Sequence, residues 1–370
     1  MLKSKLPLLY FLSGLLFLSC FYFGLRLAEH KFLWNDEIYS QIASVNGPSY
    51  SNLLLGRIGE GNTCPLFYSI QKIICDLWQY KTPNLWHYQN VFDRIILRLN
   101  PIFFMSASIM CIFFYFSRFY SLVAGVYSLF ITFSSYMVWV YWAEARPYGL
   151  WFFFTTLQSL FFIYLLRHTE LNRRAWTGLV VIHFFLSLTV IFSVAQILIV
   201  SGLIWILKER NWKKYVFLVF IPSSIALFYY LQAPHYQFWF DLTSEQLIRD
   251  CFSRDRFYIL FIFFFLLGMY FLAQKTGLPK SFPDKSLLEG VPCFFLAVLM
   301  LLAAFAVLVL FKINVSPQKE GFPIASRYFI YLTPVGIIST TLLSMNIFWA
   351  LSGNRWIQML NNKAFLGPIG

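Results

Sequence analysis

Residues 175–207 read AWTGLVVIHFFLSLTVIFSVAQILIVSGLIWIL and contain no Asp, Glu, Lys or Arg. As one helix, with a rise of about 1.5 Å per residue, this stretch would measure about 50 Å, although the hydrocarbon core of a bilayer is only about 30 Å thick. Both flanks, 167–174 and 208–214, are rich in Lys and Arg. Basic flanks favour the cytoplasmic side of a membrane. We therefore expect the stretch to cross the membrane twice, with a turn near Ser187–Ser193.

The composition of the whole chain is that of a membrane protein. Of its 370 residues, 59% are hydrophobic and 12% are charged, against about 45–50% and 25% in average soluble domains. This excludes an ordinary soluble globule and a disordered chain. Further apolar runs cover residues 6–27, 99–117, 119–140, 148–166, 215–231, 257–273, 291–311 and 328–350. They predict an all-α polytopic membrane protein, with about ten transmembrane helices in residues 1–350, the first of them a retained signal anchor, and a short cytoplasmic tail, 351–370.

The distribution of charge predicts the orientation in the membrane. Of the 29 Lys and Arg residues, 15 fall in short segments that contain only four of the 16 acids; these segments are 1–5, 118, 167–174, 208–214, 274–290 and 351–370. Because Lys and Arg in short loops stay in the cytoplasm, we expect both termini inside and the long segments 28–98, 232–256 and 312–327 outside. The net charge is +13. Because the basic residues are dispersed between apolar runs and form no clustered basic face, we expect no nucleic-acid partner.

The long outer segment 28–98 contains two amphipathic patterns. In 37–45 the apolar residues Ile38, Ile42 and Val45 recur at helical spacing, and in 65–78 Leu66, Ile70, Ile74 and Leu77 do the same. Both patterns predict helices that lie on the outer membrane surface. Pro65 suits a first helical position, with Asn62 or Thr63 as the cap. A third surface helix is expected after Thr243 or Ser244.

Acids and arginines gather at the outer boundary of the predicted helices, and mid-membrane positions are almost free of charge. In Trp34-Asn35-Asp36-Glu37, Asp36 could simply cap the helix that follows, with Glu37 in its first turn. The alternative is a general base that takes a proton from an acceptor hydroxyl. Spacing alone does not decide between these two interpretations.

Three arginines at the same boundary also have two interpretations. They are Arg98, Arg146 in Glu144-Ala145-Arg146-Pro147-Tyr148, and Arg327 in Ser326-Arg327-Tyr328. Each could extend to the headgroup region as an interface anchor, or each could hold a lipid phosphate with its planar donor fork. Glu60, between two glycines, is either a solvated loop acid or a residue that reaches the site.

These motifs, in this order, resemble the GT-C integral-membrane glycosyltransferases, most of all the family 39 branch that contains protein O-mannosyltransferases and the aminoarabinose transferases of lipid A. The resemblance is carried by the Asp-Glu pair after the first helix, Pro65-Leu-Phe-Tyr68, Arg98, Ala145-Arg-Pro-Tyr148 and Arg327-Tyr328. It covers about residues 1–350 by architecture, although the motifs are short. The sequence departs from the pattern at Thr63-Cys64-Pro65, where many relatives have His-Pro-Pro.

The resemblance implies transfer of a sugar from a polyprenyl-phosphate donor to a lipid, glycan or protein acceptor on the non-cytoplasmic face, with or without a divalent metal. Asp36 then matches the catalytic carboxylate and Glu37 its partner. Arg146, Arg327 and Arg98 are candidates for the donor phosphate, and Glu60, Tyr148 and Tyr328 for the acceptor or the site loop. No HxxH, HxxxH or DxD spacing predicts a metal site. His183, inside an apolar run, is expected to be a hydrogen-bonded interior residue. The rival functions are a lipid or oligosaccharide transporter and a non-enzymatic membrane scaffold.

Overall fold

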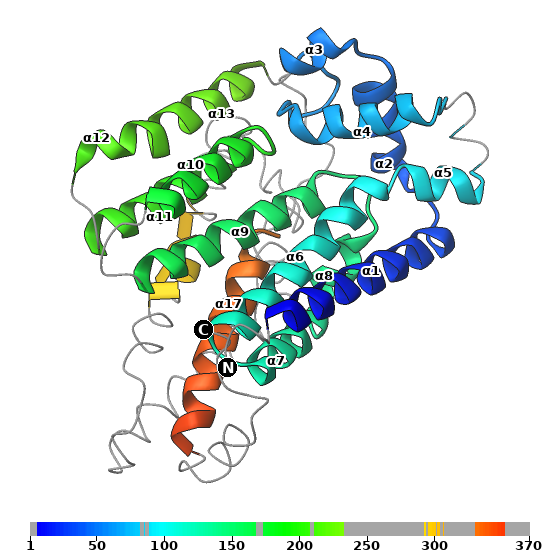
Figure 1. Cartoon of the computed structure of the whole chain (residues 1–370). Coiled ribbons are helices and arrows are strands. Elements are labelled where there is room, and N and C mark those ends of the chain that lie inside the picture. The colour runs from blue at the N-terminus through cyan, green and yellow to red at the C-terminus, as the bar shows by residue number, and fades with distance from the viewer. Residues whose placement is uncertain are drawn as a thin grey trace, which may run out of the picture.

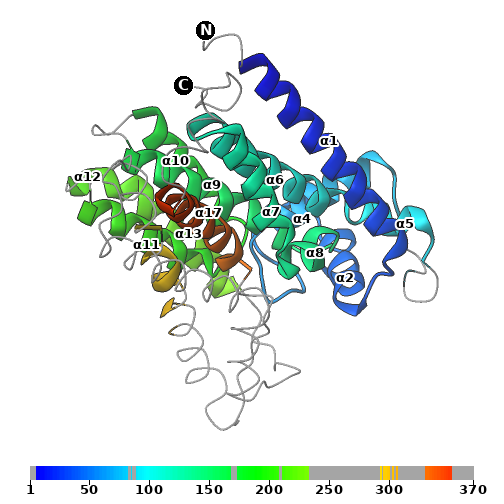
Figure 2. The ribbon, with the colours of Figure 1, turned by 90° about the horizontal axis from the view of Figure 1, so that it is seen from below.

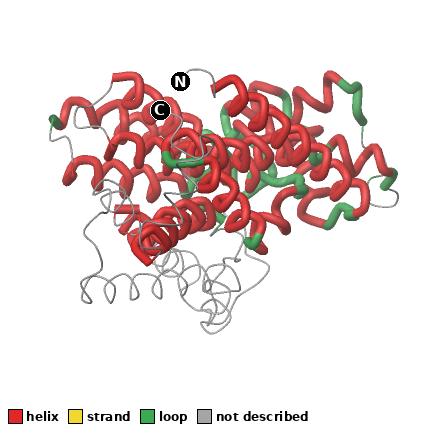
Figure 3. The backbone as a smooth tube through the Cα atoms, turned by 60° about the horizontal axis from the view of Figure 1, so that its bottom comes forward, coloured by secondary structure: helices red, strands yellow, loops and turns green. Residues whose placement is uncertain are grey.

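The computed structural model of the chain is built of helices. It describes residues 6–81, 85, 89–167, 173–207, 211–232, 330–351 and, within 292–306, all but 294, 301, 304 and 305; side chains of 346–351 are not included. Every regular element in these residues is a helix and none is a strand (Figure 3). The expected all-α class is therefore confirmed for the described part of the chain.

The order of the helices is shown by colour in Figure 1. The α-helices are α1 (Leu6–His30), α2 (Asn35–Ser40), α3 (Tyr50–Leu54), α4 (Leu66–Leu77), α5 (Val91–Ile96), α6 (Leu99–Phe119), α7 (Leu122–Phe133), α8 (Tyr136–Trp142), α9 (Tyr148–Arg167), α10 (Arg173–Ser187), α11 (Ser193–Leu207), α12 (Trp212–Tyr215), α13 (Ile221–Gln232) and α17 (Leu332–Leu351). Two short π-helices, η1 (Gln41–Asn46) and η2 (Val216–Phe220), follow α2 and α12.

Several of these helices are long and apolar enough to cross a membrane, as in a multi-pass membrane protein. In the described residues four pass this test, namely α1, α6, α9 and the segment Trp212–Gln232. The stretch 175–207 is divided as expected, because α10 ends at Ser187 and α11 begins at Ser193. The expected spans at 257–273 and 291–311 lie wholly or partly outside the described residues.

The run 119–140, expected to be one helix, is two. Helices α7 and α8 are bent by 74° at a short break. At the break, the Ser134 hydroxyl donates to Ile131 O at 2.8 Å and the Ser135 hydroxyl accepts from Val138 N at 3.4 Å. Serine side chains compete with the helix for backbone partners in this way. The Trp139 indole N–H bonds Phe133 O at 2.7 Å, so a carbonyl at the break keeps a partner.

The ends of the helices gather at two opposite ends of the bundle. At one end, which we call the site end, the segment 62–66 of the first long loop is bonded to the α10–α11 turn: Leu66 N donates to Leu188 O at 2.9 Å and Asn62 Nδ2 to Thr189 O at 3.0 Å. At the other end Arg167 donates to Phe119 O at 3.1 Å. Successive long helices thus run between the two ends in alternate directions (Figures 1 and 2).

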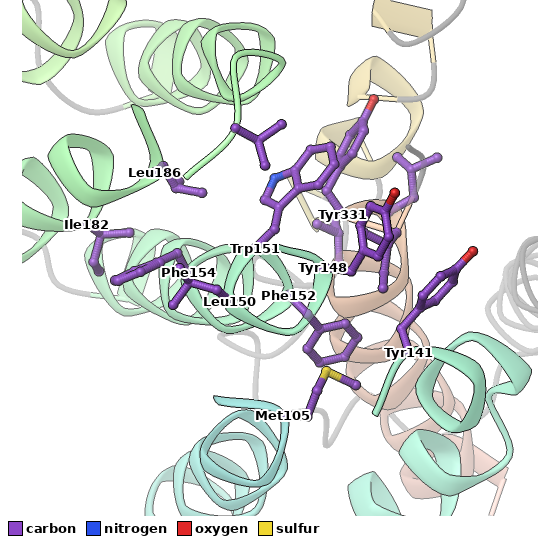
Figure 4. Close-up of a cluster of buried hydrophobic side chains, with 14 of the residues drawn as sticks. Met105, Tyr141, Tyr148, Leu150, Trp151, Phe152, Phe154, Ile182, Leu186 and Tyr331 are labelled. Carbon is purple, nitrogen blue, oxygen red and sulfur yellow. The ribbon is translucent and has the colours of Figure 1, made fainter. Parts of the chain in front are cut away.

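Helices α6 and α9 form the centre of the described core. A Cβ on Gly149 would lie 2.8 Å from Pro101 O, so only glycine lets the first turn of α9 approach α6 this closely. Figure 4 shows the adjoining cluster of large side chains, in which Trp151 of α9 stacks on Tyr331 at 5.1 Å between ring centroids. Small residues at helix contacts are typical of membrane bundles.

The first long loop contains helices at both amphipathic patterns. Pattern 37–45 forms the end of α2 and η1, and pattern 65–78 forms α4. Neither of the expected caps contacts α4, because Asn62 bonds Thr189 O and the Thr63 hydroxyl bonds Tyr229 O; Pro65 occupies the cap position itself. The helix expected after Thr243 or Ser244 lies outside the described residues.

The apolar stripe of α4 is partly buried, since Leu66, Ile70 and Ile74 pack against the core. The fully buried side chains of α4 are Phe67, Tyr68, Gln71 and Cys75, whereas Leu77 is 76% exposed. A helix on a membrane surface can leave apolar side chains outward because lipid covers them. Polar side chains of α4 are therefore available to the interior of the site end.

Candidate functional site

The short helix α2 lies between two buried ion pairs at the site end. One pair joins Glu37 to Arg98, and the other joins Glu60 to Arg146. Each pair links segments far apart in the sequence. Together they bring Asp36, Glu37, Glu60, Arg98 and Arg146, all candidates from the sequence, into one region.

The Glu37–Arg98 pair is fully enclosed, since neither side chain is exposed at all. Arg98 Nε donates to Glu37 Oε1 at 2.8 Å and Nη2 to Oε2 at 2.6 Å, a two-point contact. The backbone N–H groups of Ala145 and Trp34 complete the shell around the carboxylate, at 2.6 Å and 3.1 Å. The Glu37 carboxylate thus fixes α2 against both α6 and the segment before α9.

Arg98 has no donor left for a phosphate in this structure. Besides the two bonds to Glu37, it donates to the carbonyl oxygens of Phe32 at 3.0 Å, Ala28 at 3.3 Å and Lys31. A guanidinium has five N–H donors, and these five contacts use all of them. The expected role of Arg98 in phosphate binding therefore does not fit its geometry, and its contacts fit the positioning of α2.

The Glu60–Arg146 pair lies nearer the surface. Arg146 Nη1 donates to Glu60 Oε1 at 2.7 Å, and the two side chains are 9% and 8% exposed. The Ser40 hydroxyl accepts from the same nitrogen and donates to Glu60. Arg146 thus turns inward to a carboxylate and a hydroxyl, which is not the posture of a side chain extended to the headgroups.

Asp36 lies on the part of α2 that faces this second pair. Asp36 and Ser40 are four residues apart and so share a helix face, and Arg146 Nη1 donates to the Asp36 carbonyl oxygen at 3.2 Å. The cap position of α2 is Trp34, so Asp36 is not the cap that one interpretation expects. The Asp36 side chain is partly exposed, as a base that receives a proton from a substrate must be.

A third basic group reaches the same region. Lys31 Nζ donates to Val140 O at 3.2 Å. Burial lowers the pKa of Lys31 from its ordinary value, and the nearby carboxylates of Glu144 and Glu37 partly oppose this change. Lys31 and Glu144 therefore add one charge of each sign beside the Glu37–Arg98 pair.

Tyr148, expected near the site, begins α9 next to Arg146. It is buried and its ring meets Tyr141 of α8 edge-on, with 5.0 Å between centroids. Figure 4 places Tyr141, Tyr148 and Tyr331 along one side of the cluster. Arg327 and Tyr328 lie outside the described residues.

Two residues at the site were missed by sequence reasoning. Ser40 bridges Arg146 and Glu60. Its position one helical turn after Asp36 was the feature of the sequence that could have identified it as a site residue. Tyr68 is completely buried, and the charged groups that act on it are Glu60 and Arg146. It belongs to the quoted Pro65–Tyr68 motif, which was its signal, but it lies outside the apolar stripe that predicted the helix.

The sequence also led to an expectation for His183 and to a search for metal ligands. His183 Nδ1 lies 2.9 Å from Leu218 O and its Nε2 lies 2.9 Å from Gln158 Nε2, so the expected hydrogen-bonded interior role is confirmed. In the part of the chain that is described, no three His, Cys, Asp or Glu side chains gather as ligands of a metal ion. Glu37, the acid next to Asp36, is engaged by Arg98.

The chain was compared with known proteins in three ways. No protein-family model matches it, and neither the curated proteins nor the solved structures contain a match.

Proposed function

We propose that this chain is a membrane-embedded glycosyltransferase that moves a sugar from a polyprenyl-phosphate donor to an acceptor hydroxyl. The observation that carries the proposal is the inward-turned Arg146, a nearly buried guanidinium that bonds the Glu60 carboxylate and the main-chain carbonyl oxygen of Asp36, which is a partly exposed residue. A fixed cation is suited to a phosphate, and a nearby carboxylate is suited to take a proton from a hydroxyl.

The proposed reaction is a single displacement at the anomeric carbon. Asp36 accepts the proton of the acceptor hydroxyl as its oxygen attacks that carbon. The bond from the carbon to the phosphate oxygen breaks, and its electron pair leaves with the polyprenyl phosphate. Arg146 stabilises the charge that develops there, and Arg327 assists it. One displacement inverts the configuration of the sugar.

In this reaction Glu37 and Arg98 are positioning residues and not reacting groups. Their mutual bonds, with the Ala145 N–H contact of 2.6 Å, keep Asp36 and Arg146 in register. A phosphate at Arg146 takes the place of the Glu60 carboxylate. This exchange requires the Glu60 side chain to turn away from Arg146.

The proposed fold is a GT-C-like domain of ten crossings with segment 28–98 on the non-cytoplasmic side. Two observations support it. The first long loop and the α10–α11 turn meet at one end of the bundle, as parity requires, and the segments assigned to the cytoplasm are rich in Lys and Arg. The proposed steps use protein side chains alone, and a divalent metal remains compatible with the family resemblance.

Reconstitution tests the proposal against its rivals. The purified chain is placed in liposomes with a polyprenyl-phosphate sugar labelled in the sugar, and a detergent extract of envelope lipids and glycans is the acceptor source. An enzyme moves the label to an acceptor and leaves polyprenyl phosphate. A transporter carries the label across the bilayer unchanged, and a scaffold does neither. Either of the last two results contradicts the proposal.

A further inference from the structure

The side chain of Tyr68 is unusual among the tyrosines at the site end. Its residue is completely buried, and its hydroxyl has no hydrogen-bond partner among the described residues. Folded proteins seldom leave a buried polar atom unpaired, because it loses its bonds to water without replacement. The Tyr68 hydroxyl is one of several such atoms in the described residues, and an oxygen of a bound ligand would give it a partner.

The surroundings of this hydroxyl are those of the Glu60–Arg146 pair. Glu60 and Arg146 lie near enough to Tyr68 for their charges to act on it. Burial raises the pKa of Tyr68 well above its ordinary value, and the Glu60 carboxylate adds to the rise. The phenol therefore keeps its proton and can donate it in a hydrogen bond.

We propose that the Tyr68 hydroxyl donates a hydrogen bond to the phosphate that Arg146 binds. This inference rests on the proposed function, which places the donor phosphate at Arg146. A phosphate offers several acceptor oxygens at once, so one group can satisfy both a guanidinium and a neighbouring hydroxyl. Tyr68 is thus a second phosphate-binding residue, supplied by α4 of the first long loop.

Tyr80 provides a matched control on the same loop. Its hydroxyl donates to Asp93 Oδ1 at 2.7 Å, so it already has a protein partner. Tyr80 follows the far end of α4, and that end, Leu77, is about 14 Å along the helix axis from Tyr68 at about 1.5 Å per residue. Replacing either tyrosine by phenylalanine removes a single oxygen and retains the ring.

The experiment compares Tyr68→Phe, Tyr80→Phe and the wild-type protein, each purified at full length. Binding to vesicles that contain undecaprenyl phosphate is measured beside binding to vesicles with undecaprenol, which has no phosphate, and thermal unfolding is measured for each variant. We expect Tyr68→Phe to bind the phosphate lipid roughly tenfold more weakly, as for a lost bond to a charged group. It should unfold at the same temperature as wild type or a higher one.

The control should show the opposite pattern, with a lower unfolding temperature and unchanged phosphate binding for Tyr80→Phe. Equal phosphate binding by Tyr68→Phe and wild type overturns the inference but not the proposed function. An unfolding temperature lowered in Tyr68→Phe as much as in Tyr80→Phe also overturns it, because the hydroxyl would then have a protein partner. If wild type prefers the phosphate lipid no more than undecaprenol, the proposed function fails and this inference fails with it.

Discussion

The two ion pairs beside α2 consist of the same residue types but differ in their surroundings. In the Glu37–Arg98 pair both side chains are completely buried, and all five guanidinium donors have protein acceptors. In the Glu60–Arg146 pair both side chains keep some exposure, and the unpaired hydroxyl of Tyr68 is close by. The first pair has no capacity for a ligand. We propose that the second exchanges its carboxylate for a phosphate.

This difference separates positioning from binding. A buried pair strongly resists removal of one partner, because the other charge is left without compensation. The Glu60–Arg146 pair is also buried, but its side chains keep 8–9% exposure, so water or a ligand reaches it more easily than the fully enclosed pair. The variants below test whether the two pairs differ in this way.

The largest effect is expected when Arg98 is replaced. Arg98→Met leaves Glu37 charged and enclosed, which costs about 3–5 kcal/mol of folding free energy. We expect little folded protein, as measured by thermal unfolding in detergent and by gel filtration. Arg146→Met, the same change in the other pair, should fold at nearly the wild-type temperature, because the Glu60 side chain can turn to solvent. Similar unfolding temperatures for the two variants would remove the distinction between the pairs.

The next effect concerns Asp36, which lies between the pairs. Asp36→Asn retains size and polarity but cannot accept the proton, so transfer should fall by about 10²–10⁴-fold, as for a lost general base. Stability should not change. The control is Asp93→Asn in α5, whose carboxylate bonds Asn90 N at 2.9 Å; it should lose stability and retain transfer. Near-normal turnover by Asp36→Asn would rule out the proposed base.

A smaller effect is expected for Arg146→Lys. Lysine retains the charge but loses the planar donor fork, so affinity for a polyprenyl-phosphate sugar should fall by about tenfold, or about 1.4 kcal/mol. Turnover should fall with it, and Arg327→Lys should show a milder defect. Affinity is measured by equilibrium binding to vesicles. Wild-type affinity in Arg146→Lys would leave the arginine as an anchor only.

The smallest effect has the opposite sign. Glu60→Gln removes the negative charge that competes with a phosphate for Arg146 and retains a hydrogen-bonding side chain of the same size. We expect phosphate-lipid affinity to rise by a few-fold in the same vesicle assay. A fall in affinity would show that Glu60 contributes to the bound state, and the exchange of carboxylate for phosphate would then be incorrect.

The sequence predicted some features of the fold because they depend on length and local charge. The turn between Ser187 and Ser193 follows from the thickness of a bilayer and the basic flanks of 175–207. The bend between α7 and α8 was not predicted. Its run is continuously apolar, and two adjacent serines are a weak signal that acts only when nearby backbone groups are free to bond them.

The site was predicted in its residue types but not in its pairing. Asp36, Glu37, Glu60, Arg98 and Arg146 were all candidates, yet spacing could not show which arginine meets which acid. The partners are 61 residues apart in one pair and 86 in the other. Tyr68 was overlooked because the helix over 65–78 was expected to lie on the membrane surface, and nothing in its spacing indicated that Tyr68 is completely buried.

The most direct test of the division between the pairs is an experimental structure of the wild-type protein in lipid with bound undecaprenyl phosphate. We predict that the phosphate lies at Arg146, within hydrogen-bond distance of the Tyr68 hydroxyl, and that the Glu60 carboxylate is turned away. The Glu37–Arg98 contacts, now 2.6 and 2.8 Å, should be unchanged. A phosphate bound to Arg98 with Glu37 displaced, or one bound away from both arginines, would contradict this prediction.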